Sequence, residues 1–202
     1  MKLAVIDLDD TLVSKEITRS ASVYAYEKGL QKLRESGLNV PEELRTYSFR
    51  NLNRIIELYP RFEEAYLSAY EEYLVGRREK LMEEKQRAGK ILETLVDIYH
   101  IDEFIILTAN RAAMKIVKAM GLANNPLLRE IIIVPGINYV DEKAKIISNL
   151  KEKYERIIYV ADCVVNDAEV ARRSNVEFLH VKDLLERLYS AGTKPRSLNI
   201  QS

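Results

Sequence analysis

The feature that most constrains the fold is a set of five short, mostly apolar runs rich in β-branched residues. None of them alternates strictly between apolar and polar positions, which is typical of strands buried on both faces of a sheet. The runs are Leu3–Ile6, Phe104–Leu107, Ile131–Val134, Ile157–Val160 and Val176–Leu179. Helical patterns separate the last four runs. We therefore expect right-handed crossovers and an α/β fold with a doubly wound parallel sheet of five strands.

The interval between the first two runs differs from the rest of the chain because it contains no strand-like segment. Apolar residues recur there at helical spacing, in three groups that begin near Val23, Pro41 and Phe62. A further helix, from Lys90 to Tyr99, is expected to return the chain to the sheet. The predicted division is a helical cap at residues 15–89 inserted into a catalytic core of residues 1–14 and 90–202.

Composition excludes several classes of protein. Thirty-one basic residues balance 31 acidic ones, so a nucleic-acid binder that works by bulk phosphate neutralisation is not expected. The single cysteine, Cys163, excludes a disulfide framework and fits a reducing compartment. No apolar run is long enough to cross a bilayer. We expect a cytoplasmic protein without a membrane partner, and the sequence does not predict its oligomeric state.

Polar residues follow the apolar runs at the positions where a parallel sheet binds ligands, beyond the carboxyl ends of its strands. These residues include four acids, a hydroxyl, an amide and a lysine. Asp7 and Asp9 follow the first run, Thr108 and Asn110 the second, and Asp162, Asn166 and Asp167 the fourth, while Lys143 and Lys145 lie in the helix before the fourth. We expect these side chains to meet at one edge of the sheet.

This set of residue types indicates phosphoryl chemistry. Several carboxylates in one pocket repel one another unless a cation neutralises them, and hard oxygen ligands select Mg²⁺. Thr108 and Asn110 can donate hydrogen bonds to phosphate oxygens, and a lysine supplies a compact positive charge. The chemistry that fits is phosphoryl transfer through an aspartate nucleophile.

The order of these elements resembles the haloacid dehalogenase (HAD) superfamily, in its phosphatase branch. The four motifs of that family are matched by the segment from Asp7 to Leu12, by the strand ending at Thr108, by a lysine in a helix, and by Asp162 with Asp167 five residues later. The resemblance covers residues 1–14 and 90–190. It implies a Rossmann-like sheet with strand order 3-2-1-4-5, and the helical insert corresponds to the position of the family's helical cap.

The resemblance also implies roles for individual residues. Asp7 would attack phosphorus, and Asp9 would protonate the leaving oxygen and later activate water. Thr108 and the lysine would hold the phosphoryl oxygens, with Asn110 as a further phosphate contact. The expected Mg²⁺ ligands are the Asp7 carboxylate, the Asp9 main-chain carbonyl and the Asp162 carboxylate, with Asp167 beside them. Family members that act on carbon–halogen bonds lack an aspartate at the Asp9 position, so Asp9 favours phosphate esters.

Two assignments stay open at this point. Lys143 is followed by apolar residues three and four positions later, as in the family pattern, so it is preferred over Lys145. Asn166 competes with Asp167 for a place at the metal. The fourth motif also begins with Ala161 where the family has glycine, a small change from which we expect little effect.

The predicted function is therefore a Mg²⁺-dependent phosphatase that hydrolyses a small phosphorylated metabolite through an aspartyl-phosphate. A phosphomutase that uses the same phospho-aspartate is an alternative, since it differs only in returning the phosphoryl group to the bound product. A non-enzymatic, phosphate-binding member of the family is a third possibility. The natural substrate cannot be derived from the sequence.

Overall fold

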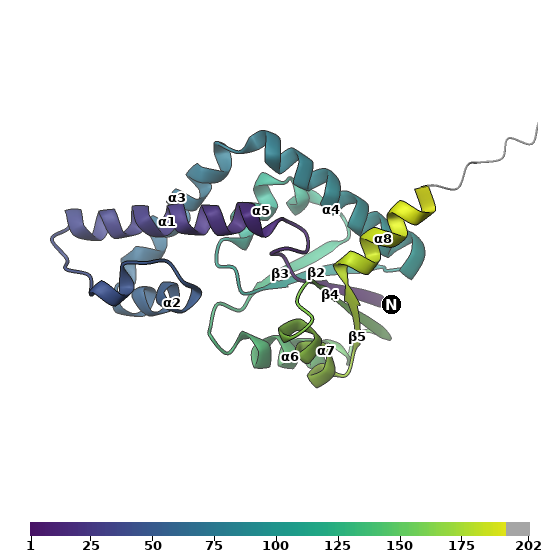
Figure 1. Cartoon of the computed structure of the whole chain (residues 1–202). Helices are drawn as coiled ribbons and strands as arrows, with labels where there is room; N and C mark the ends of the chain where they lie inside the picture. The colour runs from purple at the N-terminus through teal and green to yellow at the C-terminus, as the bar shows by residue number, and fades with distance from the viewer. Residues whose placement is uncertain (193–202) are drawn as a thin grey trace, which may run out of the picture.

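A five-stranded parallel sheet forms the centre of the molecule (Figure 1). The computed structural model describes residues 1–192, with side chains through Arg187. The strands are β1 (Lys2–Ile6), β2 (Glu103–Thr108), β3 (Leu128–Ile133), β4 (Arg156–Ala161) and β5 (Glu177–His180). Their order is β3-β2-β1-β4-β5, and every neighbouring pair is parallel. The predicted doubly wound sheet and its strand order are confirmed.

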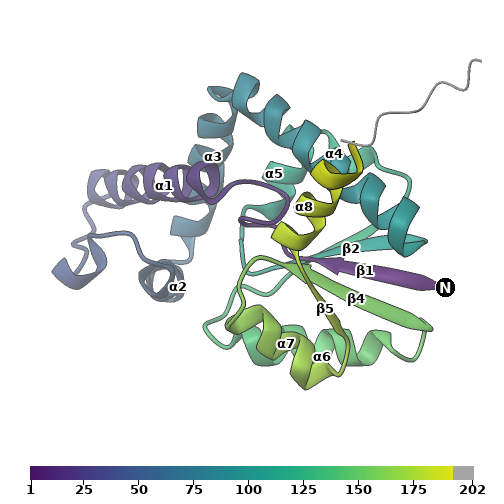
Figure 2. The ribbon, with the colours of Figure 1, turned by 45° about the vertical axis from the view of Figure 1, so that its right-hand side comes forward.

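Helices cover both faces of the sheet, which explains why the strands are apolar throughout (Figure 2). Alternate residues of β1 face opposite layers: Ala4 and Ile6 belong to one buried cluster, and Leu3 and Val5 to the other. The helices are α4 (Arg78–Tyr99), α5 (Ala113–Ala119) and α8 (Val181–Gly192) on the first face, and α6 (Tyr139–Leu150) and α7 (Asn166–Ser174) on the second. Each fully buried aliphatic side chain of this kind contributes about 1.5–3 kcal/mol.

The segment between β1 and β2 is helical, as predicted, and its first three helices lie beyond one end of the sheet (Figure 2). They are α1 (Lys15–Glu35), α2 (Phe49–Leu58) and α3 (Arg61–Val75). The prediction that Pro41 opens a long helix is wrong, because only a short 3₁₀ turn, Glu42–Leu44, follows it. Helix α2 begins at Phe49 instead, since the Ser48 hydroxyl caps it by accepting a hydrogen bond from the Asn51 amide at 3.0 Å.

Helix α4 is one continuous helix of 22 residues, so the separate helix predicted from Lys90 is its second half. Gly89 suggested a break, but a glycine inside a helix costs only about 1 kcal/mol, and strong helix formers flank it. The predicted boundary between residues 89 and 90 therefore falls within a helix. The helix ends at Tyr99, and the next residue, His100, adopts the left-handed conformation with φ 55°.

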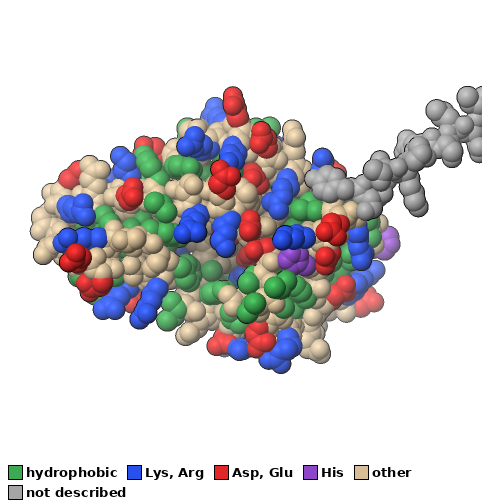
Figure 3. All heavy atoms as spheres, viewed as in Figure 1, with side chains coloured by type: hydrophobic (Ala, Val, Ile, Leu, Met, Phe, Trp, Pro, Cys, Tyr) green, Lys and Arg blue, Asp and Glu red, His purple; other side chains and the backbone are tan. Residues whose placement is uncertain are grey.

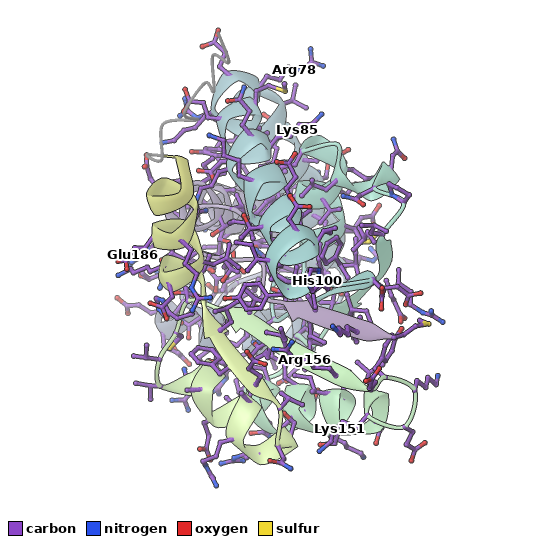
Figure 4. The ribbon with its side chains drawn as sticks, turned by 90° about the vertical axis from the view of Figure 1, so that its right-hand side faces the viewer. Arg78, Lys85, His100, Lys151, Arg156 and Glu186 are labelled. Carbon is purple, nitrogen blue, oxygen red and sulfur yellow. The ribbon has the colours of Figure 1, made fainter. Side chains whose placement is uncertain are left out.

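The amino ends of the strands form the edge of the sheet opposite to the predicted site. Figure 4 views the molecule from that side, with His100 and Arg156 near the viewer and α4 and α8 above the sheet. Within the part of the chain that the structure describes, no helix combines the length and apolar character needed to span a bilayer. The predicted core extends to residue 202, and its last ten residues, 193–202, lie outside the described part.

Candidate active site

The predicted site residues converge at the carboxyl ends of three neighbouring strands. Asp7 follows β1, Thr108 ends β2, and Asp162 follows β4, while α6 and α7 supply Lys143 and Asp167. All five line one cavity of about 550 Å³ between the core and the inserted helices. Figure 3 shows a recess there, bordered by Lys and Arg side chains above and by hydrophobic side chains below.

Three carboxylates form the centre of this site. Each of Asp7, Asp162 and Asp167 offers one oxygen, and these three oxygens lie within 4.8 Å of one another. Asp7 and Asp167 are buried and Asp162 is half-buried. Carboxylates held this close repel one another unless a cation or a proton intervenes, and an all-oxygen donor set fits Mg²⁺. The Asp9 side chain is not part of this group.

Lys143 is the basic partner of Asp7. Its Nζ donates a hydrogen bond to Asp7 Oδ1 at 2.7 Å, and the lysine is only 2% exposed. Lys145, two residues later on the same helix, is exposed to solvent. Burial raises the pKa of Asp7 to about 7, although the charge of Lys143 opposes this rise, and the nearby charges of Asp167 and Asp9 add to it. The structure therefore brings Lys143, and not Lys145, to the acid group.

Tyr159, a residue that the sequence did not single out, connects this lysine to the acids. Its hydroxyl accepts a hydrogen bond from Lys143 Nζ at 3.2 Å and donates one to Asp167 Oδ1 at 2.7 Å. The side chain is fully buried in β4. The sequence does contain a sign of this role, because Tyr159 is the one residue with a polar group on its side chain in the run Ile157–Ala161. Such a hydroxyl usually finds a partner when it is buried.

Asp167 and Asn166, which competed for the same role, point to different partners. Asp167 is buried, and its Oδ2 accepts a hydrogen bond from the Cys163 amide at 3.3 Å. Asn166 is exposed, and its Nδ2 donates to the Tyr139 hydroxyl at 2.8 Å. Only Asp167 therefore belongs to the acid group.

Asp9 lies beside the acid group, on the loop that leads into α1. Its Oδ1 accepts a hydrogen bond from Asn110 Nδ2 at 3.0 Å. Burial raises the pKa of Asp9, while hydrogen bonds from Thr18 and Asn110 oppose the rise. The loop is shaped by the next residue, Asp10, which has φ 58° and whose amide donates to the Val13 carbonyl at 2.7 Å. Asp9 is thus a half-buried carboxyl group held at the entrance to the inserted helices.

Asn110 and Thr108 organise the loop after β2. Asn110 Oδ1 accepts a hydrogen bond from the Ala112 amide at 2.9 Å, so this residue caps the following turn and also holds Asp9. The Thr108 hydroxyl is fully buried and accepts from the Asn110 amide at 3.1 Å. The structure thus shows Asn110 capping the turn that precedes α5, and its expected phosphate contact stays a prediction.

Arg111 ties this loop to the inserted helices. Its Nη1 pairs with Glu63 Oε1 at 2.7 Å and its Nη2 donates to Asn53 Oδ1 at 2.9 Å. Glu63 belongs to α3 and Asn53 to α2, so one guanidinium group bridges both helices to the core. No pattern in the sequence indicates this contact, because it depends on how the inserted helices lie over the sheet.

Comparisons with known proteins add no family to this description. The chain matches no protein-family model, and no curated protein matches it significantly. The functional reading therefore depends on the chemistry of the site itself. The site combines three carboxylate oxygens within 4.8 Å of one another, an ammonium group that contacts one of these carboxylates, and a separate carboxyl group on the adjoining loop.

Proposed function

We propose that this protein is a Mg²⁺-dependent phosphatase that hydrolyses phosphate monoesters of small metabolites through an aspartyl-phosphate. The observation that carries the proposal is the contact between Asp7 and Lys143 inside the group of three carboxylates. A buried carboxylate with an ammonium group beside it suits a nucleophile that must attack an anionic phosphoryl group. The resemblance to HAD phosphatases in four ordered motifs supports the same assignment.

The donor set fits a resident Mg²⁺. Asp7, Asp162 and Asp167 would hold the ion through carboxylate oxygens, and the small number of protein ligands suits a cation that keeps several waters. Bound there, Mg²⁺ would supply positive charge that neutralises the phosphoryl oxygens. Tyr159 contributes by fixing the Asp167 carboxylate through its hydrogen bond.

In the first step, an oxygen of Asp7 attacks phosphorus, and the bond from phosphorus to the ester oxygen breaks. Asp7 Oδ1 already accepts from Lys143, whereas Oδ2 has no hydrogen-bond partner within the described residues and is free to react. Lys143 and Thr108 neutralise or hydrogen-bond the transferring oxygens. Asp9 donates its proton to the leaving oxygen, a role that its raised pKa favours.

In the second step, water attacks the phosphorus of the aspartyl-phosphate and releases inorganic phosphate. Asp9, now ionised, accepts the proton from that water, which restores both carboxyl groups to their starting states. The hydrogen bond from Asn110 orients Asp9 for both transfers. The inserted helices line one side of the cavity, and on that side they would limit the access of other water molecules.

The proposal is tested by phosphate release from p-nitrophenyl phosphate with and without Mg²⁺. We expect turnover that chelator removes and that Asp7→Asn lowers by at least about 10³-fold, as for loss of a nucleophile. Asp97→Asn is the matched control, because Asp97 is exposed on α4 and outside the cavity. Undiminished turnover by the Asp7→Asn protein, or turnover that ignores chelator, would contradict the proposal.

A further inference from the structure

The cavity that holds the acid group continues into a second half, formed largely by aromatic side chains. Tyr47, Phe49 and Tyr66 come from the inserted segment and Tyr139 from α6 of the core. The rings of Phe49 and Tyr139 meet edge to face, with centroids 6.1 Å apart and an interplanar angle of 84°. This contact joins the inserted segment to the core at the wall of the cavity. At about 550 Å³, the whole cavity suits a small molecule.

The polar groups of this half are mostly engaged with the protein, so it offers ring surface more than hydrogen bonds. The Tyr66 hydroxyl donates to Ser22 at 3.2 Å, and the Tyr139 hydroxyl accepts from Asn166 at 2.8 Å. Ser48, another lining residue, uses its hydroxyl to cap α2. A flat aromatic group would find faces and edges to stack against.

One cation in this half has no acidic partner. Arg19, on the face of α1 that lines the cavity, has no carboxylate within 4.0 Å among the residues whose side chains are described. Of the three other long cations that line the cavity, Lys143 pairs with Asp7 and Arg111 with Glu63. Lys15 has no ion pair among the described side chains either, but its charge acts on Asp162, so it belongs to the acid side of the cavity. Arg19 and Tyr47 line the same cavity, and burial raises the pKa of the Tyr47 phenol, while a hydrogen bond with Ser22 and the charge of Arg19 oppose this rise.

We propose that the aromatic half of the cavity binds the leaving group of the substrate, and that this group is a planar aromatic ring carrying a negative charge. Ring surface from Phe49 and Tyr139 would hold the plane, and Arg19 would pair with the charge. The inference rests on the proposed phosphatase function, because it identifies the second half of the same substrate. A planar group with a carboxylate or a second phosphate fits both features, whereas an uncharged polyol fits neither.

The test uses phosphate esters whose leaving groups differ in aromaticity and charge but have similar acidity. The set is 2-phenylethyl phosphate, 2-cyclohexylethyl phosphate and 2-(4-carboxyphenyl)ethyl phosphate, which all release primary alcohols of similar acidity. We expect kcat/KM to be about 3- to 10-fold higher for the phenyl than for the cyclohexyl ester, as for one aromatic contact. The carboxylate should raise it about 3- to 10-fold further, as for one charge-assisted contact.

Variants assign these preferences to residues. Arg19→Met should abolish the preference for the carboxylate, and Phe49→Leu should reduce the preference for the phenyl ring. Arg34→Met is the matched control, because Arg34 is exposed on the last turn of α1 and outside the cavity, and it should leave both ratios unchanged. Arg19 is also exposed, so its substitution tests the inference even where Phe49→Leu impairs folding.

The outcomes separate this inference from the proposed function. Phosphate release from all three esters at equal kcat/KM would overturn the inference and leave the phosphatase intact. So would a carboxylate preference that survives Arg19→Met. Absence of Mg²⁺-dependent release from these esters and from p-nitrophenyl phosphate would overturn the proposed function, and this inference with it.

Discussion

The hydroxyl of Tyr159 donates a hydrogen bond to the Asp167 carboxylate at 2.7 Å, eight residues later in the chain. The same hydroxyl accepts from Lys143, so its single proton is directed at the acid. Both neighbours belong to the candidate active site, and all three groups are buried. Tyr159 therefore sets the orientation of a lysine and a carboxylate that are proposed to act on different partners, the phosphoryl group and the metal.

Removal of this hydroxyl by Tyr159→Phe is expected to weaken metal binding. Asp167 would lose its directed hydrogen bond, and loss of such an outer partner typically costs about 10- to 100-fold in metal affinity. Titration with Mn²⁺, followed by electron paramagnetic resonance, measures the affinity directly and without turnover. Tyr154→Phe is the control, because the Tyr154 hydroxyl bonds to Glu103 at 2.6 Å at the other edge of the sheet. Equal Mn²⁺ affinity in the wild-type and Tyr159→Phe proteins would contradict the expectation.

Lys143→Met should lower turnover of p-nitrophenyl phosphate by about 10²-fold or more, as for loss of one group that stabilises transition-state charge. The methionine keeps much of the buried stem and removes only the ammonium group that contacts Asp7. Lys145→Met changes the same residue type on the same helix at an exposed position and should leave turnover within about twofold of wild type. If the two variants lost activity equally, the assignment of Lys143 would be wrong.

Asp9→Asn should separate the two steps of the reaction. The p-nitrophenolate group leaves without a proton, so the first step continues, but no base remains to activate water for the second. The phosphorylated protein is therefore expected to accumulate, and acid quenching with mass spectrometry would detect the added phosphoryl group on a peptide containing Asp7. The doubly changed Asp7→Asn, Asp9→Asn protein should show none. A failure to trap any phosphorylated protein from Asp9→Asn would count against a two-step route.

The raised pKa of Asp7 predicts a pH dependence of stability in chelator. Between its ordinary value of 3.8 and about 7, Asp7 is protonated in the folded protein and ionised in the unfolded chain. The folded state then binds more protons, so the free energy of unfolding falls as pH rises through this window. Burial also raises the pKa of Asp9 and Asp162, which gives the same sign.

Denaturant unfolding at pH 5 and pH 7.5 in chelator measures this effect. We expect lower stability at pH 7.5, and the difference should shrink in Asp7→Asn, whose amide does not titrate. Added Mg²⁺ should raise stability more at pH 7.5 than at pH 5, because the metal needs ionised carboxylates. Stability that rises from pH 5 to pH 7.5 equally in both proteins would show that Asp7 keeps an ordinary pKa.

Arg111→Ala is expected to loosen the inserted helices from the core. The change removes the ion pair to Glu63 and the hydrogen bond to Asn53, two partly buried contacts worth about 1–3 kcal/mol together. Hydrogen exchange should accelerate in α2 and α3 while the strands keep their protection. Arg129→Ala is the control, since Arg129 pairs with Glu103 within the sheet at 2.9 Å. Unchanged exchange in α2 and α3 would mean that other contacts hold these helices.

The sheet and the convergence of the acids could be predicted because both follow from local pattern. Runs such as Ile157–Val160 are apolar on both faces, and parallel strands place their carboxyl ends at one edge, so Asp7 and Asp162 must approach each other. Contacts that depend on tertiary placement could not be predicted. The Arg111 bridge requires the angle between the inserted helices and the core, and the role of Tyr159 requires knowing that Lys143 lies opposite its hydroxyl.

Helix boundaries were misjudged where one local signal was weighed alone. Pro41 is compatible with a helix start, but only a short 3₁₀ turn follows it, and no α-helix begins until Ser48 supplies a cap. Gly89 lies at the predicted end of the insert, yet the helix continues through it because the neighbouring residues have high helix propensity. In both places the helix boundary depends on the helix propensities and caps of a whole turn of residues, and one residue is not enough to predict it.

The unbroken course of α4 restricts how the inserted helices can move. Its 22 residues span about 33 Å. One of its residues, Glu84, accepts a hydrogen bond from the Ser14 amide at 3.0 Å. Ser14 lies where the chain leaves the core for the inserted helices, and α4 brings the chain back from them to the core. The inserted helices are therefore joined to α4 at both of their ends, through this hydrogen bond and through the chain itself. We expect any movement of α1–α3 to pivot at these crossings, which would change the distance from Arg19 to the acid group more than the distances among the acids, because all three acids belong to the core.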